Sequence, residues 1–169
     1  QGSRGLGDVY KRQVTYASDN PKKNHKENIS YRNLLLKTLI KDINNPRIIF
    51  NPKISSPWAI ESIEKCKNIY SFNKIDFVIG SDLITEIFSW KNIDEIIREV
   101  TLLIIKREGY PIETNTLTKL QNNKVTYEIS SLNIPNISSS MVRLNNNYSD
   151  LPESLIEIVK KNNLYKSFR

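Results

Sequence analysis

The stretch Asp76-Phe77-Val78-Ile79-Gly80-Ser81-Asp82 decides the fold class of this chain. Its apolar run, Phe77 to Ile79, is short and continuous and is closed by Gly80, which is typical of a buried strand in a parallel sheet. A second run of this kind, Thr101 to Ile105, consists only of β-branched residues and Leu. A stretch of helical period near 94–98 separates the two runs, so the sequence predicts a βαβ unit.

Outward from this unit, strand-like runs and stretches of helical period continue to alternate in both directions. The order predicts an α/β fold of the Rossmann-like, doubly wound type with a parallel sheet. Ser30 is the expected N-cap of the first helix, and Pro57 is expected in the first turn of the second. No helix is predicted between the strands at 101–105 and 125–129. The other predicted strands are 14–17 and 47–50, and the other predicted helices are 30–43, 55–69, 138–144 and 152–161.

The start of the chain departs from this pattern. Residues 1–13, QGSRGLGDVYKRQ, have no helical or strand period and resemble the translated adapter sequence found at the ends of fragmentary reading frames. We therefore expect 1–13 to be a non-native, adapter-like segment and 14–169 to be a single α/β domain. The order of elements also begins at what should be a second strand. A strand with its crossover helix and the next strand takes about 30 residues, so we expect the first strand and helix to be missing.

Composition excludes several classes of protein. A chain of 169 residues with 38% hydrophobic and 25% charged residues can bury a core without disulfides. The net charge is +7, but the basic residues are scattered, so we expect no nucleic-acid partner. No apolar run approaches the roughly 20 residues of a membrane span, and we expect a cytoplasmic protein without a membrane partner. The single cysteine, Cys66, excludes a Cys-based zinc cluster and is expected to be a small buried residue.

Ligands of open α/β sheets bind beyond the carboxyl ends of the strands, so the loops after Ile79 and Ile105 are candidate sites. In the first loop, Gly80 lets a ligand approach the backbone and Asp82 can accept hydrogen bonds from ribose hydroxyls. The alternative is a glycine turn with a helix-capping Asp. In the second loop, Arg107 can hold a phosphate or a carboxylate, or it can be solvated. Trp90 can stack on an aromatic ring or belong to the core.

The segment Ile137-Ser138-Ser139-Ser140-Met141-Val142-Arg143 is the sharpest local signal. Serines at a helix start cap free amide groups, and the same amides favour a bound phosphate. Arg143 stands one turn into this helix, and its side chain leans back toward the N-terminus, where it can reach that phosphate. The alternative is a Ser-capped helix with a surface arginine. The only histidine, His25, lies in a polar loop, so no protein metal site is expected.

These segments, in this order, resemble the nicotinate-nucleotide adenylyltransferase family of the nucleotidyltransferase superfamily. The resemblance covers Val14 to Tyr165 and is nearest to a cyanobacterial-type subgroup. The motifs that carry it are FVIGSD at 77–82 followed by Trp90, KREGY at 106–110, ISSSMVR at 137–143, NLY at 163–165, ASDNP at 17–21 and SSP at 55–57.

The resemblance implies an enzyme of NAD biosynthesis that joins ATP to nicotinic acid mononucleotide, giving deamido-NAD and pyrophosphate, with Mg²⁺ assisting. It implies that Arg143 is catalytic, and that Trp90 stacks near the nicotinate ring. The further residues implied for ATP are Gly80, Ser81, Asp82, Ile137, Ser138 and Ser139, and those implied for the second substrate are Pro21, His25, Lys26 and Arg107.

Two departures from the family pattern bear on activity. Nothing in residues 1–29 matches the family's Gly-rich turn and paired histidines, which contact the ATP phosphates. Trp58-Ala59 also stands where the family has an aromatic residue followed by threonine. We therefore expect this chain to have little activity as given. Two alternatives stay open: a related adenylyltransferase with another acceptor, such as pantetheine phosphate, and a non-catalytic nucleotide-binding domain.

Overall fold

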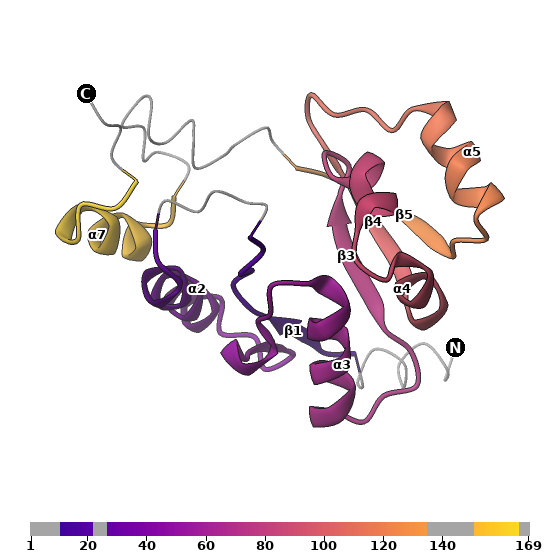
Figure 1. The fold of residues 1–169 in the computed structure, drawn as a ribbon. Coiled ribbons are helices and arrows are strands. Elements are labelled where there is room, and N and C mark those ends of the chain that lie inside the picture. Colours follow the sequence, from indigo (N-terminus) through magenta and orange to yellow (C-terminus); the bar gives the residue numbers. More distant parts are fainter. Residues whose placement is uncertain (1–10, 22–26, 135–150, 166–169) are drawn as a thin grey trace, which may run out of the picture. The chain divides into compact units, whose positions relative to one another are not determined.

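The computed structural model describes residues 11–21, 27–134 and 151–165 (Figure 1). The chain divides into two compact units, one of Gln1–Pro57 with Ser138–Arg169 and one of Trp58–Ile137. Each unit contains its own parallel sheet. The α/β class with parallel strands, predicted from the sequence, is therefore confirmed. The predicted domain bounds, 1–13 and 14–169, stay a prediction.

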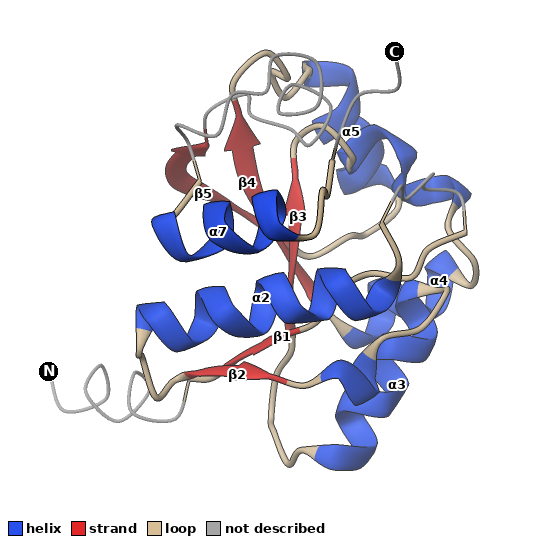
Figure 2. Cartoon of the chain, turned by 90° about the vertical axis from the view of Figure 1, so that its left-hand side faces the viewer, coloured by secondary structure: helices blue, strands red, loops and turns tan. Residues whose placement is uncertain are grey.

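The first unit is built on a two-stranded sheet, in which β1 (Gln13–Thr15) pairs with β2 (Ile48–Phe50). The helix α2 (Ile29–Ile43) joins these strands, and a short 3-10 helix, η1 (Pro52–Ile54), follows β2. The helix α7 (Glu153–Lys161) lies beside α2 (Figure 2). Two segments far apart in the sequence thus pack together within this unit, and Ser154 on α7 donates a hydrogen bond to the Asp42 carboxylate.

The N-cap of α2 lies two residues earlier than predicted. Asn28 is the N-cap, and its side-chain oxygen accepts a hydrogen bond from the backbone N–H of Tyr31 at 3.0 Å. The prediction of Ser30 as N-cap was wrong because Asn satisfies a free amide group of the first turn equally well. The helix ends at Asn44, which adopts the left-handed conformation that stops helices (φ 49°). The apolar face of α2 is only partly buried, and Leu34 is 43% exposed.

The second unit contains a three-stranded parallel sheet in the order β3-β4-β5. In it, Phe77 pairs in register with Leu102, which pairs with Tyr127. The strands are β3 (Asp76–Gly80), β4 (Thr101–Arg107) and β5 (Tyr127–Ile134), and the helices are α3 (Ala59–Ile69), η2 (Ile84–Ser89), α4 (Ile93–Glu99) and α5 (Thr114–Asn122). The continuous apolar runs of the sequence thus form β3 and β4, as predicted.

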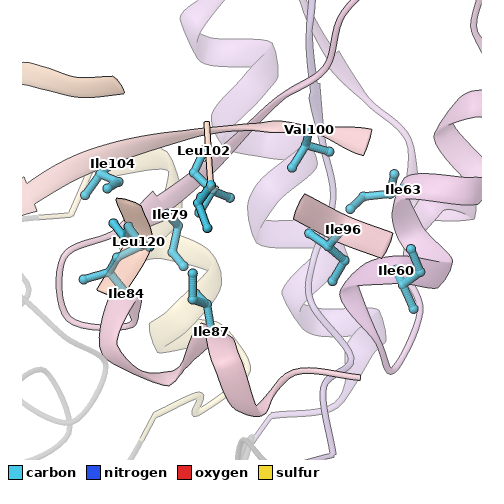
Figure 3. Packing of buried hydrophobic residues seen from close by; sticks show 11 residues of the cluster. Ile60, Ile63, Ile79, Ile84, Ile87, Ile96, Val100, Leu102, Ile104 and Leu120 are labelled. Carbon is cyan, nitrogen blue, oxygen red and sulfur yellow. The ribbon is translucent and has the colours of Figure 1, made fainter. Parts of the chain in front are cut away.

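The core of the second unit lies on the sheet face that carries Ile79, Leu102 and Ile104 (Figure 3). Isoleucines of the surrounding helices pack against this face because each helix turns its apolar side toward the sheet. Each fully buried side chain of this size contributes about 1.5–3 kcal/mol. The helical members of the cluster are Ile60, Ile63, Ile84, Ile87, Ile96 and Leu120.

The opposite face of this sheet is less covered than the sequence predicted. Alternate residues of a strand point to opposite faces, and Val78, between Phe77 and Ile79, is 56% exposed. The prediction that the whole Phe77–Ile79 run is buried was therefore wrong at its centre.

Three predictions about the helices and their residues also need correction. The helix α5 was missed, and it makes the connection between β4 and β5 a crossover, so that these strands are parallel. The N-cap of α3 is Trp58, so Pro57 precedes this helix instead of lying in its first turn. Cys66 on α3 is only half-buried. No helix within the described ranges is long and apolar enough to cross a membrane.

Candidate functional site

Polar side chains gather at the carboxyl ends of β3 and β4 in the second unit. Gly80 is the last residue of β3 and pairs in register with Ile105, two residues before Arg107 ends β4. Because the two strands are parallel, the residues that follow Gly80 meet the end of β4 at the same edge of the sheet. This is the edge at which open α/β sheets bind ligands.

Ser81 continues the pairing of β3 with β4 beyond the last strand residue. Its backbone N–H donates to the carbonyl of Ile105 at 2.9 Å, and its Oγ accepts from the backbone N–H of Arg107 at 2.8 Å. The side chain is buried, with 5% of the residue exposed. Ser81 therefore fixes the backbone of Arg107 relative to the turn at residues 80–82. This role in the scaffold was not predicted, although Ser81 was a predicted ATP-binding residue.

Asp82 and Arg107 form an ion pair across this edge. The Nη1 atom of Arg107 lies 2.7 Å from Oδ2 of Asp82, a length typical of a charge-assisted hydrogen bond. Both side chains are about four-fifths buried, since 22% of the Arg107 side chain and 20% of the Asp82 side chain are exposed. A carboxylate offers about four lone-pair positions, so Asp82 keeps acceptor capacity for a ligand. The pair gives the Asp82 carboxylate a defined direction.

Gly80 provides the space for this carboxylate. A Cβ atom at residue 80 would come closer than 3.0 Å to Oδ1 of Asp82, a separation that real Cβ atoms do not adopt. Asp82 thus folds back over Gly80 on one side and pairs with Arg107 on the other. Gly80 was predicted to allow a close approach of a ligand. The structure shows that it first allows the close approach of the Asp82 side chain.

A tight turn after β4 brings an aromatic ring to the same arginine. The backbone N–H of Tyr110 donates to the carbonyl of Arg107 at 3.0 Å, and Gly109 in between has a φ of 84°. This conformation favours glycine. The guanidinium carbon of Arg107 lies 5.5 Å from the centre of the Tyr110 ring, within the range of a cation–π contact. The guanidinium is therefore held by both Asp82 and Tyr110.

Trp90 lies at the end of η2 and packs on β3. Its ring meets the Phe77 ring edge to face, with centres 5.9 Å apart and planes at 73°. Trp90 is half-buried against the isoleucine cluster. Trp90 therefore belongs in part to the core, which was one of the two roles expected for it. The remaining exposed ring surface keeps a stacking role available, and that role stays a prediction.

In the first unit, the loop after β1 carries the predicted residue Pro21, which is exposed. Arg32 of α2 holds the start of this loop: its guanidinium donates to the carbonyl of Ser18 and to that of Glu27 at 3.1 Å. Ser55 donates its hydroxyl to the carbonyl of Ala17 at 2.7 Å. Sequence reasoning missed Arg32, because an arginine on a helix carries no signal of its own for a contact with a distant loop.

Several predicted site residues lie outside the described residues, and their roles stay predictions. They are His25, Lys26, Ile137, Ser138, Ser139 and Arg143. Among the residues that the structure does describe, no group of three or more His, Cys, Asp or Glu side chains could hold a metal ion. Mg²⁺ commonly binds through substrate phosphates and water, so this finding is compatible with a metal that arrives with a nucleotide.

Parallel sheets with helical crossovers, and a polar edge at their carboxyl ends, define a Rossmann-like α/β protein. The chain belongs to the cytidylyltransferase-like family, whose model matches residues 10–145. This match, together with the relatives described next, confirms the family resemblance noted from the sequence motifs.

Two relatives and one solved structure show which proteins of this family the chain is similar to. The chain is 29% identical over 162 residues to a probable nicotinate-nucleotide adenylyltransferase of Clostridium tetani, covering 88% of this chain and 81% of that protein. It is 33% identical over 126 residues to the protein of the same description from Clostridium kluyveri, covering 68% of this chain and 62% of that protein. Its fold matches the Plasmodium falciparum nicotinic acid mononucleotide adenylyltransferase complexed with NaAD, with a TM-score of 0.67 and 19% identity, over 97% of this chain and 89% of the other.

Proposed function

We propose that this protein transfers the adenylyl group of ATP to nicotinic acid mononucleotide in NAD biosynthesis. The 5′-phosphate oxygen of the mononucleotide forms a bond to the α-phosphorus of ATP, and the bond from this phosphorus to the β-phosphate oxygen breaks. The products are deamido-NAD and pyrophosphate. The observation that carries the proposal is the turn at Gly80–Asp82, whose carboxylate is directed by Arg107 at the ligand-binding edge of the sheet. The names of the relatives supply the acceptor.

The candidate residues have the following parts in this proposal. Gly80 and Asp82 bind the adenosine of ATP, with the Asp82 carboxylate accepting hydrogen bonds from ribose hydroxyls. Ser81 supports them through its contact with the backbone of Arg107. Trp90 lies near the nicotinate ring. Ile137, Ser138, Ser139 and Arg143 hold the base and phosphates of ATP, and Pro21, His25 and Lys26 belong to the loop that closes over the mononucleotide.

The chemistry needs no covalent intermediate on the protein. Both substrates are anionic, so the protein contributes alignment of the attacking phosphate with the α-phosphorus and positive charge around the transferred group. Arg143 is the catalytic residue in this proposal because its guanidinium can pair with the phosphates. Mg²⁺ bound to the phosphates of ATP would neutralise further negative charge when the nucleotide is present. A reaction of soluble nucleotides and a single cysteine suit the reducing cytoplasm, where we place the protein.

The test is an assay of pyrophosphate release from ATP with nicotinic acid mononucleotide, nicotinamide mononucleotide and pantetheine phosphate as separate acceptors. Protein made from the intact gene is compared with the 169-residue chain. We expect release with nicotinic acid mononucleotide, and we expect it to be much weaker for the 169-residue chain, since residues 1–29 lack the paired histidines. A preference for pantetheine phosphate would refute the acceptor, and nucleotide binding without any transfer would favour a non-catalytic domain.

A further inference from the structure

Arg107 makes its contacts with the protein rather than projecting into solvent as a free basic group. Its Nη1 atom donates to Oδ2 of Asp82 at 2.7 Å, its backbone N–H donates to Oγ of Ser81, and its guanidinium lies over the ring of Tyr110. The sequence had suggested Arg107 for the pocket of the second substrate. Because the guanidinium is already paired with a carboxylate, a substrate anion would have to compete with Asp82 for it.

We infer that Arg107 is a positioning residue, which directs the Asp82 carboxylate at the ribose of the bound nucleotide and thereby sets a preference for ribonucleotides over deoxyribonucleotides. This inference rests on the proposed function in one respect, the placement of Asp82 against adenosine. It goes further by assigning Arg107 an action through Asp82 and by assigning to the pair the discrimination against deoxyribonucleotides.

The carboxylate is confined from two sides. Oδ1 lies over Gly80, where no Cβ atom would fit, and Oδ2 is held by Arg107. Arg107 is confined in turn, because Ser81 fixes its backbone and the turn at Gly109 places Tyr110 against its guanidinium. A side chain held in this way loses little conformational entropy when a ligand binds. Loss of Arg107 would release the carboxylate without removing it.

The chemistry of a carboxylate next to a guanidinium determines what it can recognise. A carboxylate only accepts hydrogen bonds, so its ligand must be a donor. Ribose hydroxyls are donors, whereas the oxygens of ionised phosphates are acceptors. A site built to bond a hydroxyl discriminates strongly against an analogue that lacks it, since its own polar group is then left without that partner. The pair should therefore distinguish ATP from its 2′-deoxy or 3′-deoxy analogue.

The experiment compares wild type with Asp82→Asn, Arg107→Gln, Arg107→Lys and the Asp82→Asn/Arg107→Gln double variant. Arg98→Gln is the matched control, since Arg98 is an exposed arginine on α4 of the same unit. Dissociation constants for ATP, 2′-deoxy-ATP and 3′-deoxy-ATP are measured by calorimetry on protein from the intact gene. KM and kcat for both substrates are measured alongside.

We expect wild type to prefer ATP over at least one deoxy analogue by about tenfold, as for one hydrogen bond to a charged group. Arg107→Gln should reduce this ratio to about two- or threefold, with the KM for the mononucleotide unchanged. Arg107→Lys should recover part of the ratio, because lysine keeps the charge but not the planar fork. The double variant should show the same ratio as Asp82→Asn, and Arg98→Gln should show the same ratio as wild type.

Three results would overturn the inference. The first is an unchanged preference for ATP over the deoxy analogues in Arg107→Gln, and the second is a rise in this variant of only the KM for the mononucleotide. The third is a loss of ATP affinity in the double variant that equals the sum of the losses in the two single variants. Absence of nucleotide binding in wild type would overturn it as well. Failure of the proposed function is a different result. Wild type that binds ATP with the expected ratio but transfers nothing to the mononucleotide would refute the reaction and leave the role of Arg107 standing.

Discussion

The carboxylate of Asp82 lies folded back over Gly80, so that a Cβ atom at residue 80 would come within 3.0 Å of Oδ1. Gly80→Ala must therefore displace the Asp82 side chain, which is able to rotate away, and the displacement breaks its contact with Arg107. We expect the free energy of unfolding to fall by about 1.5–3 kcal/mol, since the variant loses a hydrogen bond between two charged side chains that are about four-fifths buried. We expect ATP affinity to fall about tenfold, as for Asp82→Asn.

Urea denaturation and calorimetric titration of ATP check this prediction. The double variant Gly80→Ala/Asp82→Asn is the control, because it lacks the carboxylate whose direction the alanine disturbs. Its ATP affinity should match that of Asp82→Asn alone. If Gly80→Ala bound ATP as wild type does, the direction of the Asp82 carboxylate would have no bearing on the nucleotide.

The strands β3 and β4 were predictable because their short, continuous apolar runs are a strong signal in sequence. The helix α5 was not, since TNTLTKLQN contains three threonines and two asparagines and only Leu117 and Leu120 mark an apolar side. Its formation is favoured by packing, as Leu120 is fully buried beneath the sheet. Tertiary contacts of this kind override weak local propensity.

Within the candidate site, the sequence predicted where Gly80, Asp82 and Arg107 lie but not how they are paired. Both loops follow parallel strands, which placed their residues at one edge. The contact between Asp82 and Arg107 joins residues 25 apart and depends on side-chain direction, which the spacing of residues does not encode. The buried hydroxyl of Ser81 is similar: a serine in a turn carries no sign that its Oγ bonds a neighbouring strand.

Trp90 allows separation of a packing role from a substrate role. Trp90→Ala removes a half-buried ring and its edge contact with Phe77, so we expect it to reduce the free energy of unfolding by about 2 kcal/mol, less than for a fully buried tryptophan. Trp90→Phe keeps an aromatic ring and should cost about 1 kcal/mol. If Trp90 also stacks on nicotinate, Trp90→Ala should raise the KM for the mononucleotide about tenfold, and Trp90→Phe about threefold or less.

The control for Trp90 is Phe77→Leu, which removes the ring partner on β3 without touching Trp90. It should lower stability and leave the KM for the mononucleotide unchanged. Steady-state kinetics below the unfolding transition of every variant give the comparison. A KM that moves with stability in all three variants would assign Trp90 to the core alone.

Burial raises the pKa of the Cys66 thiol on α3 above its ordinary value. The folded state therefore holds the thiol proton more tightly than the unfolded state does. The resulting stabilisation is fully present below the unfolded pKa and is lost as pH rises through the folded pKa. We expect the difference in stability between wild type and Cys66→Ala to shift against wild type as the solution is made alkaline.

Alkylation gives a second measurement for Cys66. The thiolate is the reactive form, so native protein should react with iodoacetamide more slowly than the same protein unfolded in urea at about pH 8. Cys66→Ala serves as the unreactive control. Equal rates for folded and unfolded protein would show that the thiol is as accessible and as acidic in the fold as in the free chain.

The strand β3, which carries Val78, lies at an edge of its sheet and should promote self-association. Within the described part of the chain, β3 pairs only with β4, and Val78 in the middle of β3 is 56% exposed. An exposed, apolar edge strand is a template for pairing with another chain, so we expect the 169-residue chain to be poorly soluble and to self-associate. Val78→Lys should reduce this association because a charged side chain on an edge disfavours pairing.

The matched control is Leu132→Lys on β5, at the other edge of the same sheet, where Leu132 is 66% exposed. Both variants add one positive charge at an exposed apolar position, so a general effect of charge on solubility would appear equally in both. Sedimentation velocity over a range of protein concentrations separates the two cases. Association that falls only in Val78→Lys locates the contact at β3, whereas a wild-type chain that stays monomeric and melts cooperatively would show that this edge needs no partner.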